Sequence, residues 1–343
     1  MRFKKHFVAD VAIIGGGPVG LFAAFEAGML GLSPCIIETL PAVGGQCSAL
    51  YPEKPIYDIP AHPSIKGNEL TQALCEQVSR FSPNIITNTC VQNIAYQEDK
   101  GVWYLRTNTE MVIEARSIIV ATGGGAFKPN RPPINNIAAF ENRSVFYAVK
   151  QKESFKRKTI LIAGGGDSAV DWALELAEIA EKIYLVHRRE DFRCIPGNLD
   201  SLKKIANTTK KIEFIIPFQL ESVYGNEQTG GVESVVVVHL DGQEKRMLDV
   251  DALLLFFGLS SDASCHLRWN VALSDNGRQI LVDHGTMQTS IKGVYAIGDV
   301  SSYPGKLKLI LTGFAEAALA CRSAYRFIYP DRDLDFKHST SLV

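Results

Sequence analysis

The chain has 343 residues, of which 46% are hydrophobic and 21% are charged, and its formal net charge at pH 7 is −1. This length and composition predict a folded protein of about two domains, each with its own core, and exclude a disordered chain. The near-neutral charge argues against a nucleic-acid partner, and no apolar stretch is long enough to suggest a membrane span.

The seven cysteines stand at irregular positions, and no two of them have the C-x-x-C spacing. An odd number without that spacing indicates neither a disulfide framework nor a zinc site, so we expect no bound metal. A reducing, cytoplasmic location fits this cysteine usage best.

The first informative motif is a glycine turn that follows an apolar run. Residues 8–14 predict a strand, and a helix of small residues follows the turn. Gly15 permits the tight turn, Gly17 lets the backbone approach a pyrophosphate, and Gly20 lets the helix pack on the sheet. The N–H groups at the start of that helix, which includes Pro18, would face the phosphates.

An acidic residue follows the second predicted strand. Residues 34–37 are apolar, and Glu38 comes directly after them, 18 residues past Gly20. A carboxylate at this point accepts hydrogen bonds from a ribose diol and would repel a 2′-phosphate. The turn and the acid together predict a dinucleotide site that suits FAD or NAD.

The segment after Glu38 is rich in proline. Residues 41–60 contain four prolines, at positions 41, 52, 55 and 60, and we expect an ordered, extended loop without regular structure. Residues 68–80 have helical spacing, and residues 85–120 alternate like short strands. The glycines at 123–125 end the last of these strands, where a chain can leave one domain for another.

The opening pattern then recurs as an internal repeat. Residues 159–163 predict a strand, 164–169 a G-x-G-x-x-A turn, 170–182 a helix and 183–186 a second strand. Ala169 stands where the first turn has its third glycine.

The second copy ends in basic residues instead of an acid. His187, Arg188 and Arg189 follow the strand, and Arg188 lies 19 residues past Ala169. Arginine side chains at this register would pair with a 2′-phosphate through forked, charge-assisted hydrogen bonds. The second site therefore suits NADP.

The remainder of the chain completes both domains. Residues 212–216, 232–240 and 250–257 are β-rich and would finish the second domain. An apolar strand then closes on Gly298 and Asp299, and a helix of small residues opens at 311–318. Asp299 could also be an ordinary helix cap.

With these motifs in order, the sequence resembles the two-dinucleotide-binding-domain flavoproteins, an α/β class in which a Rossmann-like NADPH domain is inserted into a split, Rossmann-like FAD domain. The resemblance implies an FAD-binding domain at residues 1–125 and 257–343 and an NADP-binding domain at 126–256. In that superfamily the strand that ends in Gly-Asp contacts the ribityl chain of the flavin, a role that falls to Asp299 here.

The second fingerprint, with Phe192 and Arg193 after the arginine pair, is most similar to that of thioredoxin reductase. The redox cysteines of that enzyme are missing, because residues 145–150 contain none. Cys47 follows a Gly-Gly loop as in glutathione reductase, but Pro52 stands at its partner position. Without two thiols beside the flavin there is no dithiol relay.

The same architecture without redox cysteines is that of the thioredoxin-reductase-like ferredoxin-NADP reductases, which residues 44–58 and 338–341 resemble specifically. In that family a loop tyrosine stacks on one face of the flavin ring. An aromatic or histidine residue from the C-terminal extension, donated across a homodimer, covers the other face. The resemblance carries these roles to Tyr51 and His338.

Two sets of cofactor contacts follow from the motifs and the resemblance. The expected FAD contacts are Gly15, Gly17, Pro18, Gly20, Glu38, Gly45, Gln46, Tyr51, Asp299, Thr312, His338 and Ser339. The expected NADP contacts are Gly164, Gly166, Asp167, Ser168, Ala169, His187, Arg188, Arg189 and Arg193.

The resemblance implies hydride transfer between NADPH and FAD, with single electrons passing to or from ferredoxin or flavodoxin. Because the cofactors carry this reaction, we expect no catalytic side chain. The helix that contains Thr312 would direct N–H groups at the flavin pyrimidine. Basic residues near the missing cysteines, namely Lys150, Lys152, Lys156 and Arg157, could steer an acidic partner.

Two other functions remain open from the sequence. One is an NADPH-dependent disulfide reductase or oxidase that resembles thioredoxin reductase. The other is a nucleotide-binding sensor or scaffold without turnover.

Overall fold

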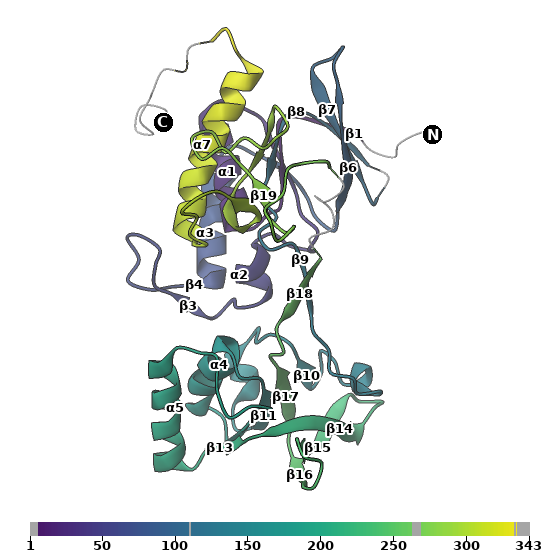
Figure 1. Ribbon diagram of the computed structural model, residues 1–343, viewed down its shortest axis with the longest axis vertical. Coiled ribbons are helices and arrows are strands. Elements are labelled where there is room, and N and C mark those ends of the chain that lie inside the picture. The colour runs from purple at the N-terminus through teal and green to yellow at the C-terminus, as the bar shows by residue number, and fades with distance from the viewer. Residues whose placement is uncertain (1–5, 110, 263–268, 333, 335–343) are drawn as a thin grey trace. The chain divides into compact units, whose positions relative to one another are not determined.

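The computed structural model describes residues 6–109, 111–262, 269–332 and 334. The chain divides into two compact units, the first made of Met1–Phe127 and Ser261–Val343 and the second of Lys128–Ser260. The second unit is therefore an insertion in the first (Figure 1). The two segments that connect them, β9 (Ala126–Pro129) and β18 (Leu259–Asp262), pair with each other.

The first unit is built on a seven-stranded sheet with the order β5-β2-β1-β8-β7-β6, in which β20 also pairs with β8. Its strands are β1 (His6–Ile14), β2 (Pro34–Ile37), β5 (Asn84–Ile86), β6 (Val91–Gln97), β7 (Val102–Thr107), β8 (Val112–Val120) and β20 (Val294–Ala296). The β6 and β7 pairings are antiparallel, and the other pairings are parallel. The parallel part is the dinucleotide-binding type of sheet that the opening motif predicts.

The three long helices of this unit, α1 (Pro18–Met29), α3 (Gly67–Ser79) and α7 (Ile310–Ile328), pack together on one side of the sheet (Figure 1). Strand β1 explains why both faces are covered. Its Val11 and Ile13 join the helical core, whereas Ala12 and Ile14 join a second core on the opposite face. Alternate side chains of a strand point to opposite faces, so this strand is buried on both.

The proline-rich segment corrects one expectation. Residues 41–60 are not free of regular structure, because they contain α2 (Gly45–Ala49) and β3 (Pro55–Ile56), which pairs with β4 (Ile65–Lys66). Gly44 and Gly45 have φ values of 114° and 53°, a left-handed conformation that turns the chain into α2. The four prolines all lie outside this helix, so none of them interrupts it.

The second unit has a five-stranded sheet, all parallel, with the order β10-β17-β11-β12-β13. The strands are β10 (Val145–Phe146), β11 (Thr159–Ala163), β12 (Lys182–Val186), β13 (Ile212–Ile215) and β17 (Ala252–Leu255). Helices α4 (Asp167–Ala177) and α5 (Pro196–Thr209) pack on one face. The antiparallel strands β14 (Phe218–Asn226), β15 (Gly231–His239) and β16 (Lys245–Asp249) pack on the other.

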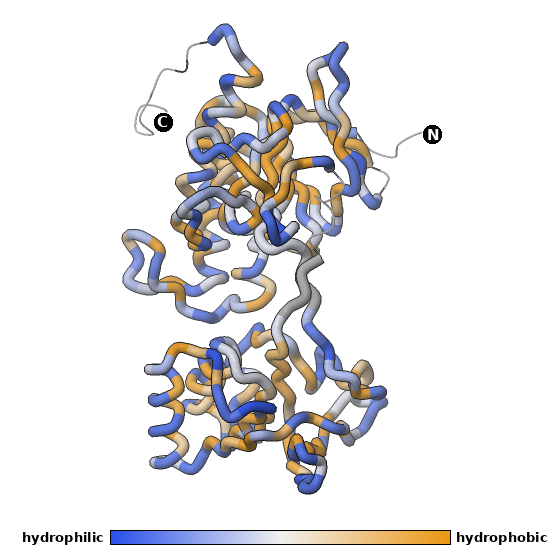
Figure 2. The backbone as a smooth tube through the Cα atoms, viewed as in Figure 1, coloured by the Kyte–Doolittle hydropathy of each residue, from blue (hydrophilic) through white to orange (hydrophobic). Residues whose placement is uncertain are grey.

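The hydropathy pattern follows these layers (Figure 2). Helix α5 carries both hydrophilic and hydrophobic residues along its length, as expected for a helix with one face on the core. The remaining short elements are η1 (Ile137–Ala139), η2 (Lys152–Phe155), η3 (Gly298–Val300), β19 (Ile280–Leu281) and β21 (Ser301–Ser302). None of the helices in the described ranges is sufficiently long and apolar to cross a bilayer.

Two predicted helix boundaries are wrong by several residues. Helix α4 begins at Asp167 instead of residue 170, because the glycine turn leads directly into it. It ends at Ala177 instead of residue 182. The N–H of Ala180 bonds to the Leu176 carbonyl at 2.8 Å, and that turn leads the chain into β12, which already begins at Lys182. The pairing of Lys182 with Thr159 of β11 takes this residue into the sheet.

Candidate functional site

The first glycine turn joins β1 to α1 and has the geometry that its sequence predicts. Gly15 has a φ of 109°, and its N–H donates to the Ile37 carbonyl of β2 at 2.8 Å. A Cβ atom on Gly20 would overlap the Gly15 carbonyl oxygen, so the helix can approach the turn only without a side chain there. Gly17 precedes α1 and Pro18 is its first residue. The first N–H groups of α1 therefore stand free of intrahelical partners next to the turn.

Glu38 is held rigidly at the end of β2. The residue is only 5% exposed to solvent. One carboxylate oxygen accepts from the N–H of Gly16 at 2.7 Å, and the other accepts from the N–H of Leu40 at 2.9 Å and the hydroxyl of Thr39 at 3.1 Å. A carboxylate offers about four acceptor positions, so it can still accept a hydrogen bond from an outside donor.

These residues border a cavity of about 280 Å³ within the first unit. Its wall is formed by the first turn, the end of β2, the α2 region, the residues after β8, the Gly298–Asp299 turn and the start of α7. The expected FAD contacts on the wall are Gly15, Gly17, Pro18, Glu38, Gly45, Gln46, Tyr51 and Asp299. Residues from segments far apart in the chain thus meet around one space.

Two of the expected FAD contacts among the described residues, Gly20 and Thr312, do not border this cavity. Gly20 lies buried behind the turn, where it serves packing. The Thr312 hydroxyl donates to the carbonyls of Leu307 at 2.7 Å and Leu309 at 2.9 Å, and Ile310 and Leu309 border the cavity in its place. The helix also begins at Ile310, one residue earlier than expected. His338 and Ser339 lie outside the described residues.

The α2 region contributes a neutral side of the cavity. The thiol of Cys47 donates to the Tyr51 hydroxyl oxygen across 3.6 Å. Burial raises the pKa of Tyr51, and the neighbouring Cys47 raises it further. Burial also raises the pKa of the Cys47 thiol. Both groups therefore stay protonated near neutral pH, and Cys47 is a poor nucleophile.

Thr122 is a cavity residue that the sequence did not single out. Its hydroxyl oxygen is buried and has no hydrogen-bond partner in the part of the chain that the structure describes. It lies on the cavity wall directly after β8, next to Gly123. An unpartnered buried hydroxyl costs free energy unless a ligand group bonds to it. The wall therefore fits a ligand that carries hydroxyl or phosphate oxygens, as a dinucleotide does.

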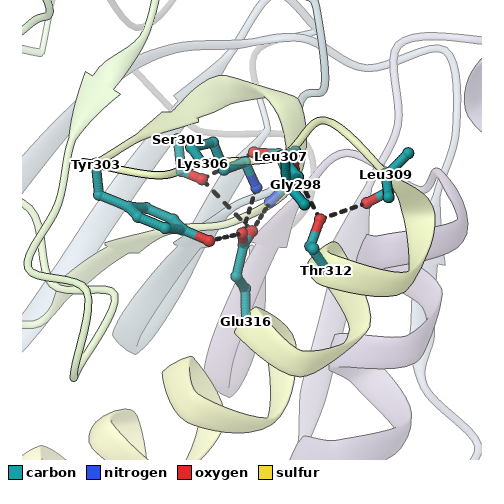
Figure 3. A network of polar contacts seen from close by, with 8 residues as sticks. All are labelled: Gly298, Ser301, Tyr303, Lys306, Leu307, Leu309, Thr312 and Glu316. Atoms are coloured by element: carbon teal, nitrogen blue, oxygen red, sulfur yellow. Dashed lines mark hydrogen bonds and ion pairs between the residues drawn. The ribbon is translucent and has the colours of Figure 1, made fainter.

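A buried network holds the Gly298–Asp299 turn beside the cavity (Figure 3). The carboxylate of Glu316 in α7 accepts from the N–H of Gly298 at 2.7 Å and from the Tyr303 hydroxyl at 2.7 Å. It also forms an ion pair with Lys306, and the two side chains are only 3% and 6% exposed. Burial raises the pKa of Tyr303 to about 12, so its hydroxyl remains a donor.

This network could not be recognised from the sequence pattern. Its one signal is a glutamate among the small residues that open α7, which on a surface helix would simply face water. Burial of that glutamate depends on where α7 packs, so the pattern alone could not identify it.

The second glycine turn repeats the geometry of the first. Gly164 has a φ of 153°, and its N–H donates to the Val186 carbonyl of β12 at 3.0 Å. Gly166 precedes α4, which begins with Asp167. Asp167 accepts from the N–H of Ile195 at 3.0 Å, so the segment after β12 folds back over the turn.

The side chains that follow β12 fall into two groups. His187 packs against Gly165, where a Cβ atom would overlap its ring, and it lies 5.0 Å from the Phe192 ring. Burial lowers its pKa, so the imidazole is neutral near pH 7. Arg188 and Arg189 are exposed instead, and their guanidinium groups form no ion pair with any described residue.

Other expected NADP contacts lie close by. The N–H of Arg193 donates to the Gly165 carbonyl at 2.7 Å, and its side chain is exposed. Ser168 is exposed in the first turn of α4, and Ala169 is buried against the sheet. Among the described residues, no group of three or more side chains that could bind a metal ion comes together.

The fold and these two turns define a class, the pyridine nucleotide-disulphide oxidoreductases, whose family model matches residues 9–317. Curated relatives match the chain over nearly its whole length. The chain is 47% identical over 336 residues to the ferredoxin–NADP reductase of Ehrlichia canis, covering 98% of this chain and 97% of the relative. It is 48% identical over 336 residues to the ferredoxin–NADP reductase of Rhodospirillum rubrum, covering 97% and 95%.

The chain therefore belongs to the ferredoxin–NADP reductase family, as its motifs predicted, and it is an enzyme of the flavoprotein oxidoreductase class. Its fold is similar to solved thioredoxin reductases. The Lactococcus lactis enzyme has a TM-score of 0.73 and 26% identity, covering 94% of this chain and 99% of that one. For the T. acidophilum enzyme the TM-score is 0.74, the identity 24% and the coverage 93% and 98%.

Proposed function

We propose that the first unit binds FAD in the 280 Å³ cavity, with the pyrophosphate at the Gly15 turn and the ribose at Glu38. The observation that carries this proposal is the joint presence on one wall of the glycine turn, a fixed carboxylate and the unpartnered Thr122 hydroxyl. When bound, FAD exchanges a hydride with a nicotinamide and passes electrons singly to a protein partner.

The residues around the flavin ring would act by position and polarity. Tyr51, neutral and partly buried, would pack against the ring, and Asp299 would meet the ribityl chain. The start of α7, at Leu309 and Ile310, would direct backbone N–H groups at the side of the ring where negative charge grows on reduction. His338 would cover the other face of the ring, from a partner subunit in a homodimer, and Ser339 would be a further FAD contact.

The second unit would bind NADPH. Arg188 and Arg189, which are exposed and lack ion-pair partners among the described residues, are suited to a 2′-phosphate. Arg193 would add a third positive charge. The neutral His187 ring would support the turn instead of contacting the phosphate, because it packs against Gly165.

The proposed partner is ferredoxin or flavodoxin, in a reducing cytoplasm. The names of the curated relatives support ferredoxin as partner, and the absence of a C-x-x-C from the sequence counts against thioredoxin. The basic cluster near residue 150 supports docking less well than its sequence suggested. Lys152 pairs with Glu175 at 2.9 Å and Glu178 at 2.8 Å, which leaves less net charge to steer a partner.

The rival functions have less support. A disulfide reductase needs two paired redox cysteines, and the sequence has neither the C-x-x-C nor the C-x-x-x-x-C spacing of such pairs. Of the two cysteines that border the cavity, Cys47 and Cys90, the first is only 1% exposed, and burial raises the pKa of its thiol. A sensor or scaffold without turnover has less support, because the curated relatives that match nearly the whole chain are named as reductases.

Three measurements test the proposal in order. The purified protein should contain one FAD per chain, and NADPH should bleach it anaerobically. Cytochrome c reduction should then require added ferredoxin or flavodoxin, and thioredoxin should not substitute. A protein that binds no FAD, or one that reduces thioredoxin disulfide faster than it reduces ferredoxin, would overturn the proposed function.

A further inference from the structure

The buried pair Lys306–Glu316 lies one hydrogen bond away from the cavity wall but is not among the expected cofactor contacts. We propose that these two are positioning residues, which hold the Gly298–Asp299 turn against the start of α7 and keep the electrostatic potential at the flavin balanced. This inference rests on the proposed function, because it takes FAD to be the ligand of the cavity.

The network ties together three segments that contribute to the wall. Glu316 in α7 accepts from the N–H of Gly298, which borders the cavity together with Asp299. Lys306 stands two residues before Lys308, another wall residue, and reaches back to the same carboxylate. The turn, the segment before α7 and the helix are thus joined at one buried carboxylate (Figure 3).

The free-energy cost of burying two charges indicates that this pair does more than stabilise the fold. Removing two charges from water is unfavourable, and apolar residues of similar volume often stabilise a core equally well. Here both charges are almost fully buried, and the Tyr303 hydroxyl and the Gly298 N–H fill further acceptor positions on the carboxylate. An apolar pair could fill the space, but it could not hold the Gly298 N–H in this orientation.

The pair also has an electrostatic consequence. Because Lys306 and Glu316 carry opposite charges in contact, their fields largely cancel at the cavity. Loss of the lysine leaves a buried negative charge, which opposes the charge that a flavin gains on reduction. Loss of the glutamate leaves a buried positive charge, which favours that charge. The two losses must therefore shift the flavin midpoint potential in opposite directions.

The test compares Lys306→Met, Glu316→Gln and the double variant by anaerobic spectroscopic titration of the bound flavin. We expect a lower midpoint potential for Lys306→Met, a higher one for Glu316→Gln and a near wild-type value for the double variant. We also expect the dissociation constant for FAD to rise about tenfold in Glu316→Gln, because the Gly298–Asp299 turn loses its anchor. Single variants that shift the potential in the same direction, or not at all, would overturn the inference.

Two further variants separate positioning from general destabilisation. Ile328→Ala, at the far end of α7, should lower the melting temperature and leave the potential unchanged. Tyr303→Phe removes one donor from the Glu316 carboxylate, so it should lower the potential slightly even if the charge variants fail to fold. An unchanged potential in Tyr303→Phe, or a shift in Ile328→Ala that equals those of the pair, contradicts the inference. If the wild-type protein binds no FAD, it is the proposed function that fails.

Discussion

Gly15 and Gly164 begin two turns that share one backbone design. Each glycine has a positive φ, of 109° and 153°, and each donates its N–H to the last carbonyl of the neighbouring strand. Each turn also packs closely on a carbonyl that follows a further strand, that of Ala121 in the first unit and Phe256 in the second. The backbone of the glycine turn is therefore the same in both units.

The side chains around the two turns differ. The first strand pair ends in Glu38, which is buried and held by hydrogen bonds, and the second ends in Arg188 and Arg189, which are exposed. A fixed acid recognises hydroxyl groups, whereas free guanidinium groups recognise a phosphate. In the proposed function, the turn therefore accepts a dinucleotide and the end of the next strand decides which dinucleotide it is.

The largest expected effect comes from the third position of the two turns. Gly20→Ala should cost about 3 kcal/mol of stability and abolish FAD binding, because its Cβ would overlap the Gly15 carbonyl oxygen. The matched change in the second turn, Ala169→Gly, should cost about 2 kcal/mol, through helix propensity and the loss of a buried methyl group, and should leave FAD binding intact. Melting temperature and flavin content check both. Equal effects of the two changes would show that the turns are not packed differently.

The second prediction removes the basic strand end. Arg188→Ala with Arg189→Ala should lower kcat/KM for NADPH at least about 30-fold, roughly 2 kcal/mol, because the proposed function pairs both charges with the 2′-phosphate. The value for NADH should stay nearly unchanged. Lys203→Ala with Lys204→Ala, exposed on α5, is the control for a general loss of positive charge. A similar loss for NADH and NADPH would argue against recognition of the 2′-phosphate.

The third prediction concerns the acidic strand end. Glu38→Gln should raise the dissociation constant for FAD about tenfold, since an amide cannot accept all three internal hydrogen bonds that Glu38 accepts now. NADP binding by the second unit should not change. Glu26→Gln, in α1 and off the cavity wall, is the matched control. Flavin fluorescence on titration of the apoprotein measures the constants, and an unaltered affinity would exclude Glu38 from the site.

The smallest effect is a pH dependence at the second turn. Burial lowers the pKa of His187, so the folded state binds fewer protons there than the unfolded state near pH 6. The stability contribution is complete above the ordinary pKa of about 6.5 and is lost as the pH falls toward the lowered value. In His187→Phe the melting temperature should fall less between pH 7 and pH 5 than in the wild type. The same decline in both proteins would mean that other groups cause it.

Much of the fold could be predicted because it follows from local patterns in the sequence. The strand, turn, helix and strand from β1 to β2 follow from apolar runs and glycines that lie next to each other in the chain. Helix α2 was missed because two glycines and several prolines surround it. A five-residue helix gains its stability from packing against α3 rather than from its own sequence.

The sequence by itself determined the two dinucleotide turns, the acid and the arginines at their strand ends, and the family, because these motifs are short and their chemistry acts locally. Only the tertiary structure decided which residues meet around the cavity. Thr122 lies far from Lys306 and Glu316 in the chain, and the roles of all three depend on burial, which no local pattern reports. The buried Thr122 hydroxyl has no described partner and can therefore bond to a ligand. Lys306 and Glu316 are buried together, so each charge needs the other as its partner.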